Sequence, residues 1–107
     1  MNTAFIIILL INALRYEPLV ESFDLTQKAE IRAEYLCTHA FSHDGFEKQF
    51  INYIAGGENL SKGFTPIDAN IAWINSPSHY RNMVNPMWNI IGIGEGSCGT
   101  LVTLFAR

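Results

Sequence analysis

The segment Ala72–Gly96, A-W-I-N-S-P-S-H-Y-R-N-M-V-N-P-M-W-N-I-I-G-I-G-E-G, decides how the rest of the chain is arranged. It predicts the end of one helix, then a second short helix, then a strand. The second helix is expected to begin after Ser76, an N-cap residue, with Pro77 at its first position. His79 then lies in the first turn, where the exposed N–H groups and the helix dipole disfavour imidazolium. We therefore expect His79 to be a neutral imidazole at pH 7, able to bind a metal or act as a base.

The end of the chain is predicted to be a β-hairpin. Asn89–Gly96 forms its first arm and Thr100–Ala106 its second. The second arm is apolar on both faces, as in a strand that is covered on both sides. Gly92, Gly94 and Gly96 share one face of the first arm, where they allow a helix or loop to approach closely. We expect a small antiparallel sheet packed between helices.

Helix start signals occur at two other places. Asp24 and Gln27 form a capping-box pattern, and Thr65 precedes Pro66 as an N-cap precedes a first helical residue. Both segments continue with apolar residues at three- and four-residue spacing, which predicts amphipathic helices. The rows are Leu25, Ala29, Ala33 (or Arg32), Leu36 and Ala40 in the first helix, and Ile67, Ile71 and Ile74, with Trp73 beside them, in the second.

Length, charge and hydropathy exclude several classes of protein. The 107 residues predict one domain, 1–107, with a core of its own. The formal net charge is −3 and the seven basic residues are scattered, so we expect no nucleic-acid partner. The apolar run Ala4–Ile11 is far shorter than the ~20 residues of a membrane span. It also lacks the basic flank and the small-residue cleavage site of a signal peptide, so we expect a buried element.

The chain contains two cysteines, Cys37 and Cys98. Two are too few for a disulfide framework or for a cysteine zinc site. A single bridge between them would require a compartment outside the reducing cytosol. We expect two small buried residues rather than a bridge.

Three ionisable residues are expected at the ends of elements: His43, Glu58 and His79. Two imidazoles and a carboxylate suit either a divalent metal or acid–base chemistry. The two histidines are far apart in sequence and form no local metal motif. By spacing alone, three ordinary polar residues at loop ends are the more frequent outcome.

Four motifs that occur in a fixed order favour a functional site over three ordinary polar residues. They are F-S-H at Phe41–His43, G-E-N-L at Gly57–Leu60, A-W-I-N-S-P-S-H at Ala72–His79, and N-P-x-W-x-x-I-G-I-G at Asn85–Gly94. Together they resemble the CAP superfamily, or SCP domain, of cysteine-rich secretory, antigen-five and pathogenesis-related proteins, and most of all its small bacterial branch. There, a stretch like N-A-L-R at Asn12–Arg15 closes the first helix, which favours a helix for residues 4–15.

The resemblance implies an α+β fold, a three-layer α-β-α sandwich around a small antiparallel sheet. It also implies a cavity that binds zinc or another divalent cation through His43, Glu58 and His79. Ser76 stands where fuller family tetrads have a second glutamate, so the metal affinity is expected to be weaker. Other residues expected to line the cavity are Asn59 and Tyr80, besides Ser76.

Three functions follow from the resemblance. The leading hypothesis is a module, not an enzyme, that holds a divalent metal and an unidentified small-molecule, lipid or peptide ligand. The second is a metal-assisted hydrolase with Glu58 as general base. The third, which the lack of a signal peptide suggests, is a structural or interaction component of an envelope or virion that uses the fold as a scaffold. The family implies an extracellular or cell-envelope location, whereas the missing signal peptide leaves virion and cytoplasm open; the sequence does not indicate an oligomeric state.

Overall fold

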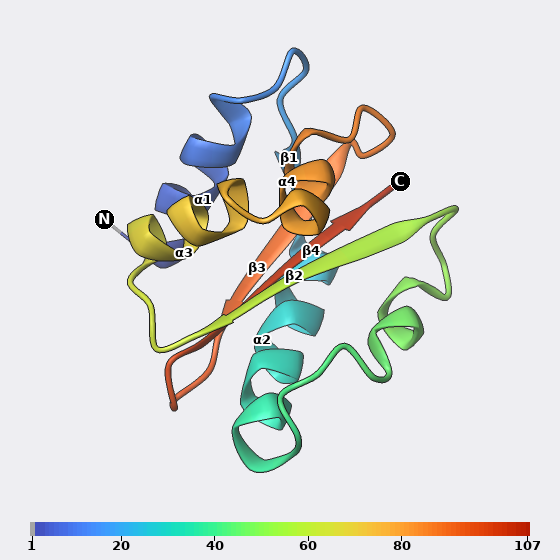
Figure 1. Cartoon of the computed structure of the whole chain (residues 1–107). Helices are drawn as coiled ribbons and strands as arrows, with labels where there is room; N and C mark the ends of the chain where they lie inside the picture. Colours follow the sequence, from blue (N-terminus) through green and yellow to red (C-terminus); the bar gives the residue numbers. More distant parts are fainter. Residues whose placement is uncertain (1) are drawn as a thin grey trace.

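The chain folds around a four-stranded sheet in the computed structural model, which describes residues 2–107 (Figure 1). The helices are α1 (Thr3–Asn12), α2 (Phe23–Thr38), α3 (Pro66–Ile74) and α4 (Pro77–Val84), with a 3₁₀ turn η1 (Phe46–Phe50). The strands are β1 (Val20–Glu21), β2 (Gly56–Lys62), β3 (Ile90–Glu95) and β4 (Thr100–Ala106). The predicted α+β class is confirmed, and so is a helix in the first segment, although it ends at Asn12 rather than at residue 15.

The sheet has the order β1-β3-β4-β2. β4 pairs antiparallel with both β3 and β2. β1, a two-residue strand after Pro18, pairs parallel with β3. The predicted antiparallel sheet is therefore mixed at this edge, because β1 returns to the sheet from α1 without a hairpin.

Helices cover both faces of the sheet (Figure 1). α2 packs on one face, where it buries Leu25, Ala29 and Leu36 against Val102 and Leu104. The other face carries α1, α3 and α4, and their core includes Ile7, Ile11, Trp73, Met83 and Trp88, against Ile93 and Phe105 of the sheet. These two cores form the expected three-layer sandwich, with β2 at an edge between the layers.

Glycines allow α2 to lie unusually close to β3. A Cβ atom at Gly92 would overlap the backbone of Leu25, and one at Gly94 would overlap the carbonyl group of Ala29. No side chain can separate the helix from the strand at these points. The close approach predicted for this glycine face is confirmed.

The N-A-L-R motif anchors both neighbours of α1. The side-chain amide of Asn12 donates to Leu19 O at 3.1 Å and its oxygen accepts from Leu19 N at 2.8 Å. The Arg15 guanidinium donates to three carbonyls at and beyond the end of α4, those of Met83, Asn85 and Trp88. The motif therefore fixes the entry to β1 and the exit from α4.

Three details of the predicted helices are wrong. Ser22, not Asp24, caps α2, since its hydroxyl accepts from Leu25 N. Ala40, placed on the buried row, lies beyond the end of α2 and is exposed. In α3 the buried residues are Ala69, Asn70 and Trp73, whereas the row of Ile67, Ile71 and Ile74 is exposed.

Cys37 and Cys98 form a disulfide, with their Cα atoms 5.7 Å apart. The expectation of two unpaired cysteines is wrong. The bond joins the last turn of α2 to the turn between β3 and β4, because the close packing of α2 on β3 brings these two ends together. It closes a sequence separation of 61 residues.

Candidate functional site

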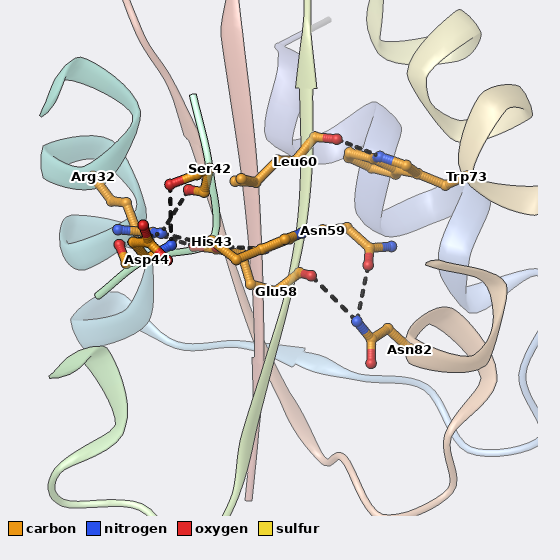
Figure 2. Close-up of polar contacts among 9 residues, drawn as sticks. All are labelled: Arg32, Ser42, His43, Asp44, Glu58, Asn59, Leu60, Trp73 and Asn82. Carbon is orange, nitrogen blue, oxygen red and sulfur yellow. Dashed lines mark hydrogen bonds and ion pairs between the residues drawn. The ribbon is translucent and has the colours of Figure 1, made fainter. Parts of the chain in front are cut away.

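The site is built on β2, which directs neighbouring side chains to opposite faces of the sheet. Glu58 points toward α2 and Asn59 toward α4 (Figure 2). The Glu58 side chain is fully buried and its carboxylate forms an ion pair with Arg32 of α2. Arg32 donates from Nε to Glu58 Oε2, and from Nη2 to Glu58 Oε1 at 3.0 Å. A buried carboxylate is thus neutralised by a buried guanidinium.

The same ion pair positions His43. Arg32 Nη2 also donates to the carbonyls of Ser42 at 3.2 Å and Asp44 at 3.4 Å, on either side of the histidine (Figure 2). His43 Nδ1 lies 2.9 Å from Glu58 Oε1. Because a carboxylate only accepts hydrogen bonds, Nδ1 is the protonated nitrogen of a neutral His43 ring. The Nε2 atom is left with its lone pair.

His79 is held by its own helix and by β2. Its Nδ1 lies 2.8 Å from the hydroxyl of Ser76, the N-cap of α4. Its carbonyl accepts from the Asn59 amide at 3.1 Å. Burial lowers the pKa of His79 below its ordinary value, and the neighbouring His43 lowers it further. The predicted neutral imidazole agrees with this direction, although burial rather than the helix dipole is the main cause.

The structure brings the two histidines together. Their ring centroids are 6.5 Å apart and the ring planes are inclined by 38°. In both rings Nδ1 is engaged, and no hydrogen bond to Nε2 occurs within residues 2–107. We call His43 and His79, with the residues that hold them (Arg32, Glu58, Asn59, Ser76 and Asn82), the two-imidazole site. Metal-binding histidines commonly have such an anchored second nitrogen.

Not every predicted site residue joins the site in the expected way. Glu58 lies within β2 rather than at the end of an element, and both of its oxygens are engaged by Arg32. Tyr80 is exposed, and no hydrogen bond in the described chain connects it to the two-imidazole site. His43 is half-exposed, with 53% of its side chain accessible. Across residues 2–107, no three His, Cys, Asp or Glu side chains converge as a metal-ligand group.

Two residues of the site were not predicted. Arg32 was only an alternative to Ala33 on the buried row of α2, yet a cation on that row needs a buried anion as its partner. Asn82 donates to Glu58 O at 3.2 Å and to Asn59 Oδ1 at 3.0 Å. It follows His79 by three residues, a spacing that places both side chains on one face of α4.

Two further observations concern a hollow near the site and the possibility of a membrane-spanning helix. A hollow of about 220 Å³ opens between α2 and η1, and it is lined by Arg32 and Asp44 rather than by the imidazoles. Among the helices of residues 2–107, none combines the length and the apolar character needed to cross a bilayer.

The sequence model of the CAP family, described as the cysteine-rich secretory protein family, matches residues 10–105. The chain belongs to the CAP family. Its bacterial relatives include the uncharacterized protein YkwD of Bacillus subtilis (strain 168), which is 36% identical over 67 residues. That match covers 62% of this chain and 26% of YkwD, so the matched segment spans about a quarter of this relative.

Solved structures of other bacterial proteins share the fold. An outer surface protein of Borrelia burgdorferi superposes with a TM-score of 0.85 at 23% identity, covering 98% of this chain and 92% of that one. An extracellular SCP-domain protein of Bacillus anthracis str. Ames gives 0.83 at 22% identity, covering 94% of this chain and 39% of that one. These similarities confirm the small bacterial-type CAP fold.

Proposed function

We propose that this CAP domain binds a divalent cation, with Zn²⁺ as the best candidate, through Nε2 of His43 and Nε2 of His79. The observation that supports the proposal is the pair of neighbouring imidazoles, each anchored at Nδ1, with ring centroids 6.5 Å apart. Imidazole nitrogen is a preferred ligand of zinc. The remaining positions would go to water and to a small or peptidic ligand.

The donor set fits a weak, open site. Two rings that share a tetrahedral zinc have centroids about 5 Å apart, given Zn–N bonds of about 2 Å. The observed 6.5 Å requires a closure of about 1.5 Å, which the half-exposed ring of His43 can supply. Glu58 does not fit as a third ligand, because Arg32 engages both of its oxygens. Its role is to orient His43.

The Glu58 environment also argues against the hydrolase hypothesis. A general base must reach the proton that it removes, directly or through one water. The Glu58 side chain has no exposed surface and is paired with a guanidinium. We therefore favour a binding module over a metal-assisted hydrolase.

We infer, further, that the domain works in an oxidising, extracellular or surface compartment. The disulfide between Cys37 and Cys98 supports this location, because such bonds persist mainly outside the cytosol. Two structural relatives, an extracellular protein and an outer surface protein, point the same way.

Calorimetric titration with zinc chloride tests the metal proposal. The wild-type chain is expected to bind one equivalent, and His43→Ala and His79→Ala are each expected to bind at least about tenfold more weakly because one of two ligands is gone. His39→Ala is the matched control, since His39 is exposed at the end of α2 and stacks on Tyr35. Equal zinc binding by wild type and His79→Ala would refute the proposal.

A further inference from the structure

The hydrogen-bond register of β2 defines which of its backbone groups face away from the sheet. Ala55 and Arg107 exchange both backbone hydrogen bonds, and Gly63 N donates to Gly99 O at the other end of the strand. In an antiparallel pair, hydrogen-bonded residues alternate with outward-facing ones. Glu58 and Leu60 therefore direct both N–H and C=O to the outer edge of β2, beside the two-imidazole site.

The two outward carbonyl groups are capped by side chains. Glu58 O accepts from the Asn82 amide at 3.2 Å, and Leu60 O accepts from the Trp73 indole at 2.9 Å (Figure 2). The outward N–H groups of Glu58 and Leu60 have no acceptor within residues 2–107. Yet both residues are buried, with exposed fractions of 4% and 8%.

The outward carbonyls of β2 are capped and its outward N–H groups are not, and this difference determines which kind of group can bind to the edge. Buried backbone N–H groups are nearly always paired, so an acceptor from outside the chain is required. An added β-strand would offer donors as well as acceptors. Its donors would have to compete with Asn82 and Trp73 for the two carbonyls. A group that only accepts hydrogen bonds fits better.

Of the two outward N–H groups, that of Leu60 is expected to bind a negatively charged group more strongly than that of Glu58. It lies between the carbonyls of Glu58 and Leu60, and both are capped by donors, which reduces their repulsion of an anion. The Glu58 carboxylate, which belongs to the same site, is on the α2 face and is neutralised by Arg32. Charge-assisted N–H···O⁻ bonds are stronger than neutral ones.

We propose that the two-imidazole site takes a ligand carboxylate, with one oxygen bound to the Leu60 N–H at the edge of β2. His79 lies one turn before Asn82 on the same face of α4, and its carbonyl accepts from the Asn59 amide, so His79 lies beside the same stretch of β2. This carboxylate position rests on the proposed function in that it specifies the ligand of the same site. It does not require the metal, so the two can fail separately.

Amide NMR with sodium acetate tests the carboxylate position. Titration is done at constant ionic strength with EDTA present, and acetamide serves as the uncharged isostere. Acetate is expected to move the Leu60 amide proton downfield with saturation in the millimolar range, and the Glu58 amide less. Acetamide is expected to give no saturable shift. N-acetylglycine mimics a peptide C-terminus. Tighter binding than acetate would indicate a peptide carboxylate as the ligand, and equal binding would indicate a small-molecule carboxylate.

Two variants at Leu60 separate the N–H from the side chain. Leu60→Pro removes the outward N–H, a change that edge strands tolerate, whereas Leu60→Ala keeps it. The side-chain amide of Asn82 and the indole N–H of Trp73 report binding in both. Acetate should leave these signals unchanged in Leu60→Pro and should shift them in Leu60→Ala.

A third variant covers the case in which Leu60→Pro does not fold. Asn82→Ala exposes the Glu58 carbonyl and is expected to weaken acetate binding at least about threefold, through the added repulsion. Asn75→Ala, which removes an exposed amide at the end of α3, is expected to leave binding unchanged. The proposal is overturned if acetate gives no saturable shift at Leu60, or if acetate and acetamide shift it alike. A zinc result of either sign leaves this outcome intact.

Discussion

The two histidines of the site differ in what surrounds them. His79 is largely enclosed beside the N-cap of α4, whereas half of the His43 side chain is exposed. Burial lowers the pKa of His79, and the electrostatic influence of the neighbouring His43 lowers it further. His79 therefore remains neutral, as the proposed metal site requires, at lower pH than an ordinary imidazole.

NMR titration in EDTA should place the pKa of His79 below 6.5. His43→Ala should raise the pKa of His79, because it removes one of the two causes that lower this pKa. The unfolded chain then binds more protons than the folded one between the folded pKa and 6.5, so stability falls as pH falls through that window. His79→Gln should remove this part of the pH dependence in denaturant unfolding. A pKa of His79 at or above 6.5 would contradict the assignment of burial as its cause.

The Arg32–Glu58 pair provides a second test at the scale of residues. Arg32→Met leaves the fully buried Glu58 carboxylate without its cation, which is expected to cost about 3–5 kcal/mol of unfolding free energy. The double variant Arg32→Met/Glu58→Gln should recover much of that loss, because no charge is then buried. Denaturant unfolding of the singles and the double measures the coupling. Additive losses would mean that the pair is not the source of the effect.

The sequence was informative about which residues meet, and less so about their roles. His43, Glu58 and His79 could be placed in one site because their motifs resemble a known family. The role of Glu58 could not be predicted from that resemblance. It depends on Arg32, which lies 26 residues away in the chain and meets Glu58 only after α2 packs on the sheet.

At the scale of elements, β2 shows where local sequence preference fails. Its sequence, G-G-E-N-L-S-K, contains residues that are depleted in strands, and the sequence did not predict a strand here. Tertiary contacts hold it as a strand: β4 pairs along its whole length, and Asn82 and Trp73 cap its free carbonyls. Helix starts with proline, at Pro66 and Pro77, were predictable because that signal is local.

The packing of α2 on β3 leads to a prediction about Gly94. Gly94→Ala would place a Cβ atom against the backbone carbonyl of Ala29, which no side-chain rotation relieves. We expect a loss of about 3 kcal/mol in unfolding free energy. Gly63→Ala is the control, since no atom lies within 4 Å of its Cβ and only the positive φ is strained, at about 1 kcal/mol. Denaturant unfolding compares the two, and equal losses would argue against close helix packing as the cause.

At the scale of the whole molecule, two long-range ties close the three layers. Arg15, just after α1, donates to carbonyls at and beyond the end of α4, on the face of the sheet that carries α4 and its His79. The disulfide joins the end of α2 to the β3–β4 turn, on the opposite face. The two-imidazole site lies between these faces, at the β2 edge, so its geometry depends on both layers remaining docked.

The last prediction concerns the disulfide. It closes 61 residues of chain, so its loss is expected to lower the free energy of unfolding by about 4 kcal/mol, mainly by releasing the unfolded chain. The variant Cys37→Ser/Cys98→Ser measures this loss in guanidinium, and dithiothreitol should lower the wild type to a similar midpoint. Dithiothreitol should not change the double variant, which serves as the control. Because α2 and β3 would still be in contact through their glycine face, we expect the reduced protein to keep its fold and the two-imidazole site at low temperature. An unchanged midpoint on reduction would show that the bond is not formed in solution, and it would remove the structural support for an oxidising compartment.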